Sequence, residues 1–132
     1  MWNRFDKDLG LLIIRITLGG LFMLYGWPKI TGGPENWEKL GGSMENLGIT
    51  FFPVVWGFLA AFAEFGGGLL LIAGFLFRPA LLALVFTMFV AVIFHAAKGE
   101  GFDGYYSALQ YLLLFVGLFV SGPGKYALRV KV

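Results

Sequence analysis

The sequence lacks cysteine entirely, and it holds a single histidine among its 132 residues. Without cysteine the chain cannot form disulfides, thiolate metal sites or a CxxC redox relay. With one histidine, a single copy cannot hold a haem between two histidine ligands, and an HExxH zinc motif is absent as well. Any electron chemistry therefore requires a bound molecule, and no metal site is expected.

Charge is also scarce, since Asp, Glu, Lys and Arg make up only 14% of the residues. The net charge of +2 and the lack of a basic run argue against nucleic acid as a partner. Hydrophobic residues reach 58%, above the roughly 45–50% found in soluble domains. The sequence therefore predicts an integral membrane protein whose surroundings are the lipid bilayer.

Four apolar stretches cover about residues 9–30, 51–77, 80–97 and 105–121. Each is close to the about 17–25 residues that cross a hydrocarbon core as a helix. An open sheet is excluded because its edge groups would lack hydrogen-bond partners in lipid. The sequence predicts an all-α fold with one domain over residues 1–132, an integral membrane four-helix bundle.

The distribution of lysine and arginine predicts the orientation of this bundle. An even number of spans puts both termini and the turn at Arg78-Pro79 on one side. That side collects six basic residues, Arg4, Lys7, Arg78, Lys125, Arg129 and Lys131. The other side has three, Lys29, Lys39 and Lys98. The excess favours cytoplasmic termini.

The segment 31–50, rich in glycine, is then an external loop. It is expected to hold a short helix lying on the membrane, with Trp37 and Leu40 as its apolar side. Tryptophan tends to anchor at membrane interfaces. Four tryptophans fall near the predicted interfaces, namely Trp2, Trp27, Trp37 and Trp56.

Glu64 is the only charged residue in the apolar run from Phe51 to Phe77, near the depth of the bilayer centre. A charge at that depth costs about 2.5–3.5 kcal/mol, so a partner is expected. Arg15 in the first stretch is the preferred partner, because its guanidinium can bind a carboxylate bidentately. Two alternatives to a functional ion pair between Arg15 and Glu64 remain open. Arg15 could reach the cytoplasmic headgroups instead, or the pair could be purely structural.

Glycines and heptad steps indicate how these helices pack. Arg15, Phe22 and Lys29 are spaced so that they share one face of the first helix. The run Gly66-Gly67-Gly68 weakens a helix in isolation, but small residues let membrane helices approach closely. We expect this run to mark the tightest helix contact, although a kink that exposes carbonyls to a cavity is the alternative.

Polar side chains gather at one depth near the predicted external ends of the helices. They are Tyr25 and Lys29 on the first helix, His95 on the third, and Tyr106, Gln110 and Tyr111 on the fourth. Together they could line a pocket with Glu64 and Arg15 at its floor. Aromatic walls and hydrogen-bond donors would suit a quinone-like head group. Taken alone, His95 is more often a hydrogen-bonded interfacial residue.

An ordered set of motifs across nearly the whole chain resembles the DoxX family of small four-helix membrane proteins. The set comprises Leu12-Ile13-Ile14-Arg15-Ile16 with Gly19, Gly26-Trp27-Pro28-Lys29-Ile30, Ala63-Glu64-Phe65-Gly66-Gly67, Met88 with His95, Gly101-Phe102, and Gly122-Pro123-Gly124-Lys125-Tyr126. The resemblance implies a bacterial cytoplasmic-membrane protein related to the membrane subunit of a thiosulfate:quinone oxidoreductase. It implies no defined reaction, and kinship of fold is no evidence of activity.

The chain departs from the family pattern at two ionisable positions. Where the family commonly has histidine in the first-helix motif this chain has Tyr25, and Gln110 stands in place of a glutamate. Glu64 and His95 are therefore the groups expected to move a proton, which makes them the candidate catalytic residues. Arg15, Tyr25, Lys29 and Gln110 join them as candidate substrate-binding residues.

Three classes of function follow from these residues. The first is a quinone-linked redox accessory subunit that takes electrons from a soluble oxidoreductase partner. The second is a small-molecule or proton-coupled transporter, for which four helices are few, so that a homodimer is expected. The third is an assembly or docking protein whose buried polar residues only fix helix register. Whether the chain is an enzyme is left open.

Overall fold

The computed structural model describes residues 4–99 and 101–126, which are helical with short connections and contain no strand. The elements are α1 (Arg4–Thr31), α2 (Gly33–Gly41), the 3-10 helix η1 (Gly42–Leu47), α3 (Pro53–Ala73), α4 (Phe77–Ala97) and α5 (Phe102–Ser121). Arg129 and Lys131, which contribute to the predicted orientation, lie outside the described residues. The predicted all-α fold is confirmed.

Four helices of the described chain are long and apolar enough to cross a membrane, which confirms the predicted number of spans. They are Lys7–Thr31 within α1, and all of α3, α4 and α5. The predicted end of the second span at residue 77 is wrong, because Gly74 adopts a left-handed conformation that ends α3 at Ala73. The predicted turn at Arg78-Pro79 is wrong too. Pro79 lies in the first turn of α4, where the backbone N–H has no partner within the helix, so proline is tolerated there.

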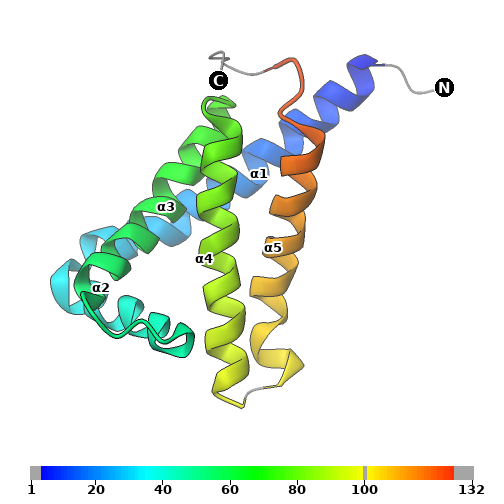
Figure 1. Cartoon of the computed structure of the whole chain (residues 1–132). Coiled ribbons are helices and arrows are strands. Elements are labelled where there is room, and N and C mark those ends of the chain that lie inside the picture. The colour runs from blue at the N-terminus through cyan, green and yellow to red at the C-terminus, as the bar shows by residue number, and fades with distance from the viewer. Residues whose placement is uncertain (1–3, 100, 127–132) are drawn as a thin grey trace.

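The spans are arranged as two pairs joined in the middle (Figure 1). α1 packs against α3, α4 packs against α5, and the α3–α4 contact joins the pairs. In Figure 1, α1 and α3 lean away from α4 and α5 toward the end that carries α2. The backbones of α1 and α5 do not approach each other, and aromatic rings fill the space between them. Phe22 lies 5.0 Å, centroid to centroid, from both Tyr111 and Phe115.

The closest approach between spans is the α1–α3 contact, and it is made by glycine. A Cβ added to Gly19 would clash with the carbonyl oxygen of Gly68, and one added to Gly68 would clash with that of Gly19. Gly67 faces α4, where an added Cβ would lie 2.9 Å from Leu84. The predicted packing role of the glycine run is confirmed at these two positions, and α3 continues through the run without interruption.

The segment between α1 and α3 folds back over one end of the spans. Its α2 confirms the short helix expected in this loop. Gly41 contacts the backbone of Pro53, and Gly57 contacts the backbone of Trp37, so α2 lies directly on the first turns of α3. We call α2 and η1 together the roof. It is also tied to α1, because the indole of Trp37 donates a 3.0 Å hydrogen bond to the carbonyl of Lys29.

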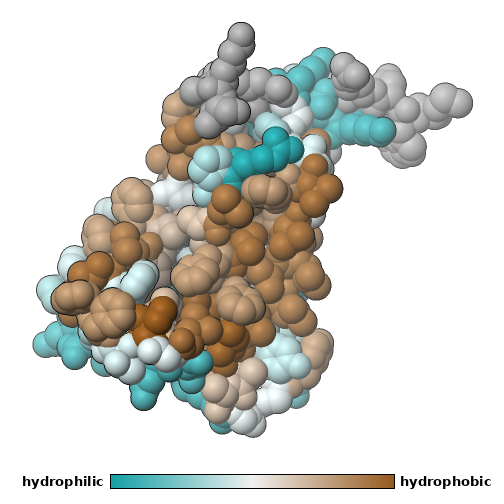
Figure 2. All heavy atoms as spheres, viewed as in Figure 1, coloured by the Kyte–Doolittle hydropathy of each residue, from teal (hydrophilic) through white to brown (hydrophobic). Residues whose placement is uncertain are grey.

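The surface between the two ends of the molecule is apolar, as a bilayer requires. In Figure 2 a hydrophobic band covers the visible faces of α4 and α5, and hydrophilic residues gather toward the ends. Along α5, Leu113, Val116 and Val120 all expose large parts of their side chains. Exposed apolar side chains at the middle of a span are ordinary for a helix that faces lipid.

Candidate functional site

The buried carboxylate of Glu64 is paired with the ammonium group of Lys29. Lys29 Nζ donates to Glu64 Oε2 at 2.8 Å and to Oε1 at 2.9 Å. Glu64 is only 4% exposed, halfway along α3, whereas Lys29 lies in the last turn of α1. The heptad spacing placed Lys29 on the buried face of α1 correctly. A charged pair with two short hydrogen bonds explains how Glu64 is tolerated inside the span.

The predicted pair of Arg15 and Glu64 is wrong, because α1 and α3 run antiparallel in a register that separates them. Contacts between the helices join Gly26 to Phe65 and Gly19 to Gly68. Arg15, about 21 Å from Lys29 along the helix axis, therefore lies beside the end of α3 and not beside its middle.

Arg15 instead binds four backbone carbonyls, and it is completely buried. Its guanidinium donates to Leu71 at 2.9 Å and Ile72 at 2.8 Å, which are the last carbonyls of α3. It also donates to Pro123 at 3.1 Å and Tyr126 at 2.6 Å, in the segment after α5. A cation at a helix C-terminus is favourable, since the final carbonyls there lack helical partners. Arg15 thus joins α1, the end of α3 and residues 122–126.

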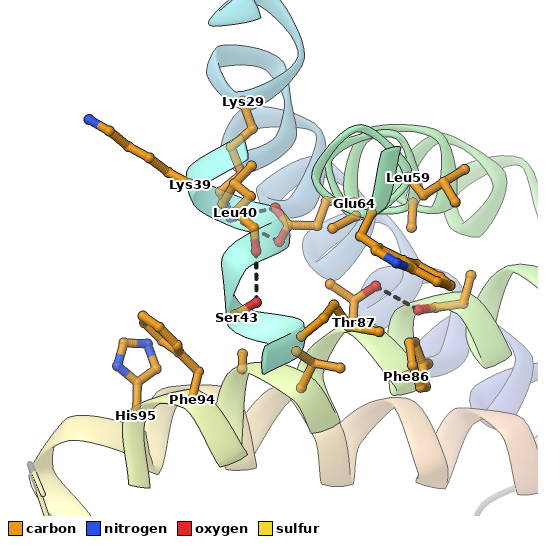
Figure 3. A pocket seen from close by; sticks show the side chains of 17 residues that line it. Lys29, Lys39, Leu40, Ser43, Leu59, Glu64, Phe86, Thr87, Phe94 and His95 are labelled. Carbon is orange, nitrogen blue, oxygen red and sulfur yellow. Dashed lines mark hydrogen bonds and ion pairs between the residues drawn. The ribbon is translucent and has the colours of Figure 1, made fainter. Parts of the chain in front are cut away.

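A pocket of about 450 Å³ lies between α3 and α4 under the roof (Figure 3). The lining residues are Lys29, Lys39, Leu40, Ser43, Met44, Trp56, Leu59, Ala60, Ala63, Glu64, Ala83, Phe86, Thr87, Val90, Ala91, Phe94 and His95. The lining positions on α3 and on α4 recur every three or four residues, so each helix presents one face. In Figure 3, Glu64 projects from α3 toward the roof, and His95 stands on α4 across from it.

The pocket contains both hydrogen-bond donors and hydrogen-bond acceptors. The indole Nε1 of Trp56 is buried and has no acceptor among the described residues. The hydroxyls of Ser43 and Thr87 donate to the carbonyls of Leu40 and Ala83, which leaves their oxygens free to accept. An indole N–H without a partner costs about 1–3 kcal/mol.

The structure brings together three of the predicted site residues and separates the others. Lys29, Glu64 and His95 line the pocket. The expected placement of Tyr25 and Gln110 in it is wrong, because Tyr25 of α1 faces α5 and α5 itself contributes no lining residue. Tyr25 lies in the aromatic contact between α1 and α5, with its hydroxyl 3.4 Å from that of Tyr111. Gln110 is exposed on α5.

Four polar lining residues were missed by the sequence reasoning, namely Lys39, Ser43, Trp56 and Thr87. Trp56 had a signal, because it stands eight residues before Glu64 and so shares its helix face. Thr87 had one as well, eight residues before His95. Lys39 and Ser43 had none, since only the fold of the roof brings them over the pocket.

The pocket can hold an apolar body and fix it through a few polar contacts. Its walls are Leu, Ala, Val and Phe, the ammonium of Lys29 is neutralised by Glu64, and the side chain of Lys39 points away from the other lining residues in Figure 3. Such a site favours a neutral ligand with acceptor oxygens over an anion. Among the described residues no three potential metal-ligating side chains come together.

Comparison with known proteins gives concordant matches. The DoxX family model matches residues 10–97. Inner membrane protein YqjF of Escherichia coli K12 is 35% identical over 125 residues, which cover 92% of this chain and 91% of that protein. Inner membrane protein YphA of the same organism is 29% identical over 126 residues, which cover 89% and 86%. No solved structure matches the chain. The chain therefore belongs to the DoxX family of membrane proteins.

Proposed function

We propose that the chain binds a quinone-type ring in the pocket between α3 and α4, and that it is the membrane accessory subunit of a redox system. The observation that carries the proposal is the pocket lining, which combines the Lys29–Glu64 pair and His95 with the aromatic rings of Trp56, Phe86 and Phe94. A quinone ring supplies a carbonyl acceptor for the indole, a second carbonyl for an ammonium or imidazole, and a flat face for Phe86 or Phe94.

The chemistry proposed for this pocket is proton delivery to a ring reduced from outside. A quinone becomes a quinol by taking up two electrons and two protons, one proton on each carbonyl oxygen. The electrons come from a soluble oxidoreductase docked on the roof side. Lys29 and His95 are the proposed proton donors, one proton each, and both are reprotonated afterwards from water, while Glu64 stabilises the charged form of Lys29. The unsatisfied N–H of Trp56 stabilises the negative charge that develops on the oxygen.

We place both termini in the cytoplasm of a bacterial cell, with the protein in the cytoplasmic membrane. The support is the excess of lysine and arginine on the side of the termini and the inner-membrane names of the two Escherichia coli relatives. The roof and the pocket then face the periplasmic side. A reporter that works only in the cytoplasm should be active when it is fused to the C-terminus. A reporter that works only in the periplasm should be inactive at the same position.

Binding of a quinone analogue to purified protein tests the proposal. A short-chain menaquinone or ubiquinone analogue should raise the melting temperature, and the rise should shrink in Glu64→Gln and His95→Ala. Gln110→Ala is the matched control, because Gln110 has a similar polar side chain but is exposed outside the pocket. An equal loss in Gln110→Ala, or no rise with any quinone in the wild type, would contradict the proposal.

Transport is the second candidate, and the buried ion pair inside a span favours it. Protonation of Glu64 would break the pair and could be coupled to movement of a small molecule. The separating experiment is substrate or proton flux in proteoliposomes, with Glu64→Gln as the inactive control. Flux without quinone binding would replace the redox proposal. Co-purification of a soluble protein without either signal would favour docking.

A further inference from the structure

We infer that the ligand enters the pocket sideways from the bilayer, through an opening between α3 and α4 that we call the portal, edged by Leu59, Ala83 and Phe86. The substrate class is then a membrane-dissolved amphiphile with a small neutral head and a long apolar chain. The chemical identity of the ligand's head group rests on the proposed function. The route by which the ligand enters rests on the shape of the pocket alone.

The roof covers the end of the pocket that faces the water. Met44 of η1 is buried, and Leu40 and Ser43 line the pocket from above. The roof cannot lift easily, because Gly41 and Gly57 hold it in backbone contact with the first turns of α3. Its contact to the end of α1 through Trp37 is a further anchor. The roof therefore narrows the way from the water into the pocket.

The residues that edge the portal are apolar and exposed. Leu59 is 48% exposed and Phe86 is 47% exposed, although both also line the pocket. Leu59 is about 9 Å along α3 from its start at Pro53, and Phe86 is near the middle of α4. Both positions are therefore at the depth of hydrocarbon. Lining residues that are also lipid-exposed make the pocket continuous with the bilayer.

Charge and size agree with an amphiphile whose head enters first. The side chains that edge the portal are apolar, and the charged groups Lys29 and Glu64 come from other positions of the lining. A volume of about 450 Å³ falls at the lower end of the about 300–1,000 Å³ of small-molecule sites. It accommodates a ring and the beginning of a chain. The rest of a long chain would extend between Leu59 and Phe86 into the lipid.

Labelling of a single introduced cysteine tests the path without any quinone, because the chain has no cysteine of its own. Ala60→Cys puts a thiol inside the pocket. In reconstituted vesicles we expect a long-chain maleimide dissolved in the bilayer to label it faster than a charged, water-soluble maleimide. Leu82→Cys, 58% exposed on α4 and outside the pocket, is the positive control for delivery from lipid.

Blocking the portal gives the decisive comparison. Ala83→Trp, added to Ala60→Cys, should slow labelling by the long-chain reagent at least about tenfold. A tenfold change corresponds to the lower part of the free-energy cost of forcing a larger side chain into an apolar space. Leu82→Trp, one residue away but outside the pocket, should leave the rate unchanged. Faster labelling by the charged reagent, no long-chain labelling, or equal rates in the two tryptophan variants would overturn the portal. Failure to bind quinone would leave these rates as predicted, so the two proposals fail separately.

Discussion

Replacing Arg15 should destabilise the protein by several kcal/mol, about as much as breaking the buried Lys29–Glu64 pair. The guanidinium is fully buried and holds four carbonyls from two segments, Leu71 and Ile72 at the end of α3, and Pro123 and Tyr126 after α5. Alanine at this position leaves those carbonyls without their donor and opens a cavity of arginine size. Neither loss can be repaired by water if the site stays closed to solvent.

The size of the effect follows from the number and type of the bonds. Hydrogen bonds to a charged group contribute about 1.5–3 kcal/mol each, so four bonds give a gross value of about 6–12 kcal/mol. Burial of the cation costs several kcal/mol, which alanine would recover. We therefore expect Arg15→Ala to lower the free energy of unfolding by about 3–5 kcal/mol. Arg15→Lys should lose most of this as well, because a single ammonium cannot span four carbonyls.

Unfolding of the purified protein in mixed micelles, followed by circular dichroism against denaturant, measures the effect. Arg78→Ala is the control, since Arg78 is exposed and makes one 3.1 Å hydrogen bond, to the carbonyl of Phe119. It should cost about 1 kcal/mol or less. If Arg15→Ala costs no more than Arg78→Ala, the four bonds do not stabilise the fold and the reasoning fails.

Three other predictions follow from the packing and the pocket. Gly68→Leu should prevent α1 from packing on α3 and lower the yield of folded protein. Gly117→Leu should be tolerated, because nothing lies within 4 Å of a Cβ added there. Size-exclusion profiles of the two variants measure the difference. Trp56→Phe should keep the melting temperature, because it removes an unsatisfied donor, yet weaken binding of a quinone analogue about five- to tenfold. Lys29→Met should destabilise the protein by about 3–5 kcal/mol in unfolding assays, because Glu64 loses its partner, and adding Glu64→Gln should restore most of that loss. A double variant less stable than Lys29→Met would contradict this account of the pair.

Much of the fold could be predicted because lipid imposes simple rules. Apolar length alone gave four spans, and the heptad positions of Arg15, Phe22 and Lys29 gave the buried face of α1. The end of α3 was missed because Gly74 lies inside an apolar run, where composition does not change and only the left-handed conformation stops the helix. Helix ends inside hydrocarbon-like sequence are set by backbone geometry, which composition does not report.

The site was predicted less well, because depth along a helix says nothing about rotation or register. Arg15 was the expected partner of Glu64, yet the antiparallel register pairs Glu64 with Lys29. Gln110 has the right depth, but it points away from the pocket on α5. His95 was placed in the pocket correctly. The apolar residues of α4 give no help with rotation, since they occur on all sides of that helix.

The four carbonyls around Arg15 also set an order of assembly. Two of them belong to residues 108 and 111 positions later in the chain, so they emerge from the ribosome only after α5. Until then Arg15 has at most two of its four carbonyl partners. Its guanidinium should therefore stay near the lipid headgroups, as the arginine of a single membrane helix does. The first span to be synthesised is therefore the last to reach its final depth, and a chain stalled before Pro123 should remain sensitive to protease at its first helix.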